Sequence, residues 1–247
     1  MTIESAVDLA GMREVGRLVG HAIKTMRAAT QAGITTHELD DIGAEFLRRH
    51  GARSAPRFAY GFPGFNLISV NEEIVHGVPG PRVLRAGDVV KIDVTAELGG
   101  YIADSADTVL IAPVADDAWR LRRCAEAAFA RAMRVARTGG ALRAIGREIE
   151  SEVRRRGFSV VRELSGHGVG RTIHEAPEVP NYDSARATET LTEGLVLAVE
   201  PILSLVPARV VEERDGWTLR THNRTLAVHY EHTVVIRRGR PLVLTAA

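Results

Sequence analysis

Two aspartates, Asp93 and Asp104, lie on either side of the glycine pair Gly99-Gly100 in the segment VVKIDVTAELGGYIADSADTV. If the apolar stretches beside the glycines form a hairpin centred immediately before Gly99, the two aspartates are directly opposite each other. Directly opposed residues have Cβ atoms about 4.5–5.5 Å apart, so the two carboxylates would repel and weaken the sheet. One or two divalent cations would offset that repulsion, because carboxylate oxygens are hard ligands. The alternative is a pair of solvated aspartates on a surface turn.

Two further acids and one histidine extend this pattern in the second half of the chain. Glu200 follows an apolar stretch in LVLAVEP, and Glu231 lies in LAVHYEHTVVI, which we expect to form one strand over 226–236. His167 lies in SGHGVG, where flanking glycines free the backbone to turn the imidazole inward. Four carboxylates and one imidazole suit two divalent ions about 3.5–4 Å apart that share a water or hydroxide. Such an oxygen-rich set favours Co, Mn, Fe(II) or Zn in a hydrolytic pair.

Two other histidines precede prolines in predicted loops, His76 in NEEIVHGVP and His174 in TIHEAP. Neutral imidazoles at the rim of a site can donate to a scissile carbonyl group or pass protons near pH 7. Taken singly, a histidine of this kind is more often an ordinary surface or core residue than a catalytic one.

Helical signals precede these motifs in both halves. Apolar residues recur every three or four positions after Ser5, and capping signals at Thr35 open a second helix that we expect to end before Gly51. After Pro113, Asp116 or Asp117 is the predicted N-cap of a third helix. A fourth carries Leu142, Ile145, Ile149 and Val153 on one face.

The two halves resemble each other in spacing. Gly33 and Gly51 are separated from Gly139 and Gly157 by the same number of positions. A carboxylate is carried by each of the strands expected over 89–94 and 101–109, and another follows the stretch that leads to Glu200. We infer an α+β fold of duplicated α-α-β halves about a pseudo-twofold axis. Fortuitous glycine spacing is the alternative.

Composition restricts the functional class. The 247 residues have a formal net charge of +1, which gives no global attraction to nucleic acid or to an anionic membrane. A single cysteine, Cys124, rules out an internal disulfide framework and fits a reducing compartment. No stretch approaches the roughly 20 apolar residues of a membrane span. We therefore expect a cytoplasmic protein with no DNA or membrane partner.

Six motifs, in order along nearly the whole chain, resemble those of type I methionine aminopeptidases, the short members of the M24 metallopeptidase family. They are NEEIVHGVPG with His76, KIDV with Asp93, ADSADT with Asp104, SGHGVGRTIHEAP with His167 and His174, AVEP with Glu200, and YEHT with Glu231. The resemblance implies the pita-bread form of this fold, with antiparallel sheet and outer helices. It also implies a single catalytic domain over 1–247, with pseudo-repeats at about 5–112 and 115–240.

The same resemblance implies roles for the site residues. Asp93 would chelate one metal, His167 and Glu200 would bind the other, and Asp104 and Glu231 would bridge both. A metal-bridging hydroxide would attack the first peptide bond, with Glu200 as general base. His174 would steady the carbonyl oxygen, and His76 would contact the peptide nitrogen or the leaving amine. Substrates would be peptide N-termini and nascent polypeptides that begin with methionine, with a transient contact with the ribosome.

The expected pocket for the substrate side chain departs from the family pattern. Where relatives often have two aromatic residues, a cysteine and a phenylalanine, this chain has Ala59, Phe62, Leu67 and Ile173, whereas Trp217 is kept. A common glutamine near the last ligand is His229. Strict selectivity for methionine is therefore in question.

Two alternatives remain. One is an aminopeptidase of the same fold with a different preference for the first residue, including Xaa-Pro peptides. The other is a peptide-binding module without catalysis, although such modules usually lose metal ligands and this chain keeps all five.

Overall fold

The helices of the computed structural model, which describes residues 1–246, begin and end near their predicted capping residues. They are α1 (Ala6–Ala29), α2 (Thr36–Arg49), α3 (Ala55–Tyr60), α4 (Asp116–Val135) and α5 (Leu142–Arg155). Ser5 caps α1, and Thr35 caps α2 through a complete capping box with Glu38. Gly51 and Gly157 follow α2 and α5 with φ values of 76° and 82°, in the left-handed conformation that commonly ends a helix.

One predicted cap is wrong. The N-cap of α4 is Ala115, whose side chain makes no capping bond, while Asp116 and Asp117 lie in the first turn. Carboxylates in that turn still interact favourably with the helix dipole, so the acidic signal marks the start of the helix without supplying the cap.

The strands form four antiparallel sheets. The first contains β1 (Arg53–Ser54), β2 (Leu67–Val70), β4 (Val89–Leu98) and β5 (Tyr101–Leu110), and the largest contains β7 (Ser165–Gly168), β8 (Glu175–Pro180), β9 (Val196–Val199), β14 (His232–Val235) and β15 (Leu242–Val243). A third contains β6 (Ser159–Val160), β10 (Ile202–Ser204) and β13 (Ala227–His229), and the fourth β3 (Glu73–Val75), β11 (Val210–Glu212) and β12 (Leu219–Thr221).

The central hairpin has a different register from the predicted one. Gly99 and Gly100 form its two-residue turn, with φ values of 59° and 83°, so Leu98 pairs with Tyr101. A turn with two positive φ angles matches the twist of the strands and favours glycine at both positions. The prediction that Asp93 lies directly opposite Asp104 is therefore wrong.

The stretch predicted as one strand over 226–236 is two strands in different sheets. β13 pairs with β10, whereas β14 pairs with β9 and β15. Between them, Glu231 leaves both ladders and exchanges backbone hydrogen bonds with Ala106 of β5, at 2.9 and 3.4 Å. This break brings the second half of the chain against the central hairpin.

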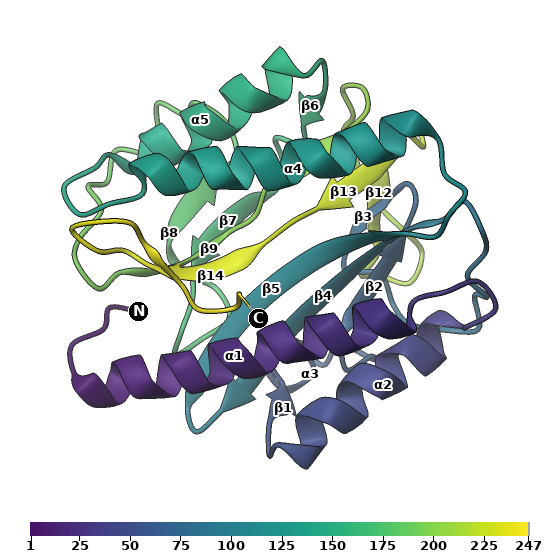
Figure 1. Ribbon diagram of the computed structural model, residues 1–247, viewed down its shortest axis with the longest axis horizontal. Helices are drawn as coiled ribbons and strands as arrows, with labels where there is room; N and C mark the ends of the chain where they lie inside the picture. Colours follow the sequence, from purple (N-terminus) through teal and green to yellow (C-terminus); the bar gives the residue numbers. More distant parts are fainter. Residues whose placement is uncertain (247) are drawn as a thin grey trace.

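The duplicated arrangement is visible in Figure 1, where α1 and α2 lie together on one side of the strands and α4 and α5 on the other. Met12, Val19 and Ile92 belong to a core that packs the first helix pair on its sheet. Leu121 and Ile149 belong to the matching core of the second half. Among residues 1–246, no helix has the length and apolar character required to cross a membrane.

Candidate metal centre and active site

Asp93 and Asp104 share one face of the central hairpin. In the observed register Asp93 pairs with Ala106 and Asp104 pairs with Thr95. The two acids are thus diagonal neighbours, a relationship in which side chains still reach each other. Thr95 donates its hydroxyl to Oδ1 of Asp104 over 2.8 Å, which fixes one carboxylate oxygen, and Oδ2 lies 4.0 Å from Nε2 of His167.

The backbone of Asp104 is tied to the second half of the chain. Its N–H donates to Oγ1 of Thr233 over 2.9 Å, and that hydroxyl donates to the carbonyl of Asp104 over 2.7 Å. These bonds lie beside the Glu231–Ala106 pair, so the two halves are joined where their acids meet.

Glu200 and Glu231 both lie just outside a strand end. Glu200 follows β9, and its carbonyl accepts a 2.9 Å bond from Asn181. Both side chains are buried, with relative exposures of 8% for Glu200 and 1% for Glu231. Residues that leave a ladder can direct a side chain at an angle that the regular pleat does not allow.

His167 enters the site from β7 and is oriented by its own backbone. Its Nδ1 lies 2.9 Å from the carbonyl oxygen of Gly168, and because a carbonyl only accepts, Nδ1 carries the proton. The lone pair of Nε2 therefore faces the acids, 3.6 Å from Glu200 and 4.0 Å from Asp104. A Cβ at Gly166 or Gly168 would lie 2.3 Å from a carbonyl oxygen of β9 or β8, so these glycines permit close strand packing.

Burial shifts the protonation of this cluster. It raises the pKa of Glu200 to about 8, and it raises the pKa values of Asp93 and Glu231 well above their usual ranges, with neighbouring carboxylates adding to both shifts. Within residues 1–246, Oδ1 of Asp93 and Oε1 of Glu231 have no hydrogen-bond partner although both atoms are buried. Buried and unpaired carboxylate oxygens are costly unless a cation binds them, so these residues fit a metal site.

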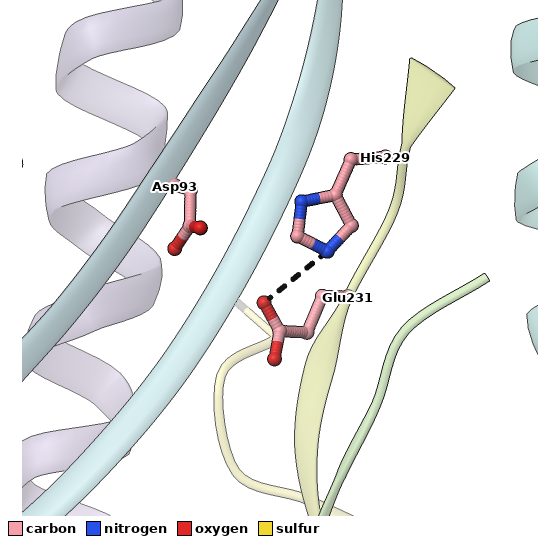
Figure 2. A group of neighbouring side chains, drawn as sticks. All are labelled: Asp93, His229 and Glu231. Carbon is pink, nitrogen blue, oxygen red and sulfur yellow. Dashed lines mark ion pairs between the residues drawn. The ribbon is translucent and has the colours of Figure 1, made fainter. Parts of the chain in front are cut away.

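Two sets of ligand atoms are close enough to hold an ion each. Asp93, His229 and Glu231 form one set, and Asp104, His167 and Glu231 form the other, with all atoms of a set within 4.8 Å of one another. Glu231 belongs to both sets. Figure 2 shows the first set, with the carboxylates of Asp93 and Glu231 on the side toward which the His229 ring projects.

The two loop histidines lie at the rim of the same centre. The rings of His167 and His174 meet edge to face with centroids 4.4 Å apart, and Nδ1 of His174 lies 2.7 Å from the hydroxyl of Tyr60. His76 has a φ of 60° and lies immediately after Val75 of β3. Burial lowers the pKa values of His76 and His174 to about 4, so both imidazoles are neutral at pH 7.

A cavity of about 290 Å³ opens onto the acids and has an apolar wall. Its lining includes all five predicted ligands and both loop histidines, together with Phe62, Leu67, Ile173 and Trp217. The rings of Phe62 and Trp217 pack edge to face with centroids 5.3 Å apart. Ala59 is exposed and does not line the cavity, and the next residue, Tyr60, takes that place.

Sequence reasoning did not assign His229 or Tyr60 to the site. His229 precedes Glu231 by two positions, and a spacing of two places side chains on the same face of a strand, which was a usable signal. Tyr60 carried no comparable signal, because its contact with His174 joins segments far apart in the chain.

Comparison with known proteins agrees with this architecture. The family model described as metallopeptidase family M24 matches residues 10–238. "Methionine aminopeptidase 2" of Bacillus subtilis is 38% identical over 99% of both chains. A methionine aminopeptidase of Clostridium perfringens is 40% identical over 98% of this chain and 96% of its own. A crystal structure of the methionine aminopeptidase from Thermotoga maritima superposes over 100% of both chains with a TM-score of 0.96 and 31% identity.

Proposed function

Because the chain belongs to the M24 metallopeptidase family, we propose that it is a metal-dependent aminopeptidase that removes N-terminal methionine from peptides and nascent proteins. The observation that carries the proposal is a cluster of buried acids and imidazoles at the end of a cavity with an apolar wall. The acids suit a metal-assisted hydrolysis, and the wall suits an unbranched apolar side chain.

We assign two divalent ions, from Co, Mn, Fe(II) or Zn, to Asp93, Asp104, His167, Glu200 and Glu231. Such ions, when bound, lower the pKa of water and polarise a carbonyl group. The donor set fits them because oxygen ligands predominate and imidazole nitrogen is present. Glu231 belongs to both ligand sets, which supports its assignment as a bridge.

The remaining chemistry falls to side chains of the chain itself. Glu200 is the general base, because its carboxylate lines the cavity and lies 3.6 Å from Nε2 of the ligand His167. It takes a proton from the attacking water and returns it to the leaving amine. With the Tyr60 hydroxyl donating to Nδ1 of His174, Nε2 of that ring carries a proton that it can donate to the carbonyl oxygen.

His76, which also lines the cavity, contacts the peptide nitrogen. It is neutral at pH 7 because burial lowers its pKa to about 4, so it neither repels the metal site nor competes with the substrate amine. The free α-amino group of the substrate then lies among the acids, which restricts hydrolysis to N-termini. Nascent chains are the natural substrates, and a transient contact with the ribosome accompanies their processing.

The test is release of methionine from Met-Ala-Ser by purified protein, stripped of metal and then reconstituted with Co, Mn, Fe(II) or Zn. We expect release only after reconstitution. Asp104→Asn removes a ligand and should lower kcat/KM by more than about 100-fold. Loss of a residue that only hydrogen-bonds to a ligand lowers activity by up to about that factor. Asp116→Asn, on the exposed first turn of α4, is the matched control.

The alternatives have distinct outcomes in the same assay. Hydrolysis of Xaa-Pro peptides without release from Met-Ala-Ser would contradict the methionine assignment and favour a related aminopeptidase. Binding of peptides without hydrolysis under any metal would contradict catalysis altogether.

A further inference from the structure

His229 is buried at the metal centre with no hydrogen bond to its ring. The side chain is 2% exposed, and within residues 1–246 neither Nδ1 nor Nε2 has a hydrogen-bond partner. Its Nε2 lies 3.3 Å from Oε2 of Glu200 and 3.6 Å from Oε2 of Glu231. A buried imidazole without partners costs free energy, so its position beside two acids requires a reason.

The separations fit two ligands of one ion better than a hydrogen bond. A ring N–H donates over about 2.7–3.2 Å, and both separations exceed that range. Ligand atoms held about 2.0–2.2 Å from the same metal at octahedral or tetrahedral angles are roughly 3.0–3.5 Å apart. Within the set that contains His229, its Nε2 lies 3.6 Å from Oε2 of Glu231, close to this range, and the 3.3 Å separation from Oε2 of Glu200 places the ring beside the second metal position as well.

The two ligand sets have matching composition. One contains Asp93 with His229 (Figure 2) and the other Asp104 with His167, and both include Glu231. Each set therefore has one aspartate, one imidazole and the shared glutamate. The set that the family resemblance assigned to Asp93 had no imidazole of its own.

We propose that His229 is a metal ligand, so that each of the two metal positions receives one imidazole nitrogen. The inference rests on the proposed function, because it concerns the metals of the same site. It makes the centre richer in nitrogen than the set of four carboxylates and one histidine, which favours zinc and cobalt over manganese.

The backbone around His229 is fixed in advance of binding. Its N–H donates to Oγ1 of Thr108 over 3.0 Å, and that hydroxyl donates to its carbonyl over 2.8 Å. On the other side, β13 pairs His229 with Ile202 of β10. A ligand held by such bonds loses little conformational freedom when it binds a metal. Metal sites usually require ligands that are positioned in this way before the ion binds.

The first measurement is a zinc titration of protein labelled with ¹⁵N in its histidines, followed by long-range ¹H–¹⁵N NMR. This spectrum distinguishes a ring nitrogen that carries a proton, a free lone pair or a metal. We expect two histidines to acquire a metal-bound nitrogen, and His229→Gln and His167→Gln should each remove one of them. Glutamine keeps an N–H donor at position 229 and removes only the nitrogen ligand. His21→Gln, on the exposed face of α1, should leave both signals unchanged.

The second measurement is the affinity for zinc and manganese by titration calorimetry. His229→Gln should weaken zinc binding at one position by about tenfold or more, with a smaller effect on manganese. If zinc binds and only His167 changes in the wild-type spectrum, His229 is not a ligand while the proposed function stands. If the wild-type protein takes up no divalent metal, the proposed function fails as well. A wild-type spectrum with fewer than two metal-bound ring nitrogens contradicts the proposal even if a variant does not fold.

Discussion

The hydroxyl of Tyr60 lies 2.7 Å from Nδ1 of His174, and the two rings stack with centroids 5.7 Å apart. Tyr60 is half exposed at the mouth of the cavity, whereas His174 reaches inward to the edge of His167. A hydroxyl that donates to Nδ1 would place the ring proton of His174 on Nε2, so the tyrosine can set the tautomer from outside the metal centre. A residue in this position should affect the chemical step without altering the metals.

Tyr60→Phe should lower kcat by roughly two- to tenfold with little change in KM, because a neutral hydrogen bond contributes about 0.5–1.5 kcal/mol. The ring stack is kept in this variant, so only the tautomer preference is lost. Steady-state kinetics with Met-Ala-Ser checks this, together with metal content, which should not change. Phe58→Leu, at an exposed aromatic residue on the same helix, is the control. An unchanged kcat in Tyr60→Phe would mean that the hydroxyl does not orient His174.

Metal binding should stabilise the folded chain. Glu200 and Glu231 are buried and Asp93 is half-buried, and desolvation raises all three pKa values, so their charged forms oppose folding without a cation. A metal at about 100 times its Kd contributes about 2.7 kcal/mol. For a chain of this size that raises Tm by about 5–10 °C.

Scanning calorimetry of the stripped and cobalt-loaded protein measures this shift. Asp104→Asn should show less than half of it, because one ligand is lost, and Asp116→Asn should show all of it. Calorimetric binding of cobalt without any rise in Tm would contradict the placement of the ions among these buried acids.

The helices were predictable because their signals are local. A capping box at Thr35 and a left-handed glycine after α2 depend on residues within a turn of each other, and both are present. The family and the α+β fold also followed, since the motif residues keep their order along the chain.

The register of the central hairpin and the break before β14 depended on distant contacts. Glycine at both turn positions fits either of two hairpin centres, and only the observed pairing of Leu98 with Tyr101 decides between them. The break at Glu231 is fixed by its bonds to Ala106, which no periodicity in LAVHYEHTVVI reveals. For the same reason Tyr60 was not assigned to the site, since its contact with His174 joins distant segments.

A buried carboxylate away from the site should give the protein a distinct stability profile in acid. Glu152 is 3% exposed and accepts bonds from Arg155 at 2.7 and 3.0 Å and from Arg156 at 2.6 Å. These bonds lower the pKa of Glu152 to about 2, from a usual value of 4.5. Its folded pKa is depressed, so the stability it contributes is present above pH 4.5 and is lost as the pH falls toward 2.

Glu152→Gln should therefore lower the free energy of unfolding by about 1–3 kcal/mol at pH 6, allowing for screening of the partly exposed arginines. The difference from the wild type should shrink between pH 4.5 and pH 2. Urea unfolding of both proteins after metal removal measures it, so that loss of metal in acid does not contribute. Glu148→Gln, which removes a carboxylate whose one ion-pair partner among residues 1–246 is Arg131, should show a smaller difference. A wild-type advantage that persists unchanged at pH 2 would contradict the assignment.

The apolar wall of the cavity should set selectivity for the first residue of the substrate. Ile173 is 4% exposed and lines the cavity together with Leu67. The isoleucine side chain, smaller than that of phenylalanine, leaves room for a substrate branched near its Cγ atom. We expect the wild-type protein to hydrolyse Leu-Ala-Ser at a measurable rate beside Met-Ala-Ser. Ile173→Phe should raise the kcat/KM for Met-Ala-Ser relative to that for Leu-Ala-Ser by about tenfold. That change corresponds to the low end of the 1–3 kcal/mol by which an apolar pocket distinguishes one methylene group.

Val7→Phe places the same ring on an exposed position of α1 and should leave the ratio unchanged. An equal ratio in the wild type and Ile173→Phe would show that Ile173 does not select the substrate. The packed rings of Phe62 and Trp217 would then determine the preference instead.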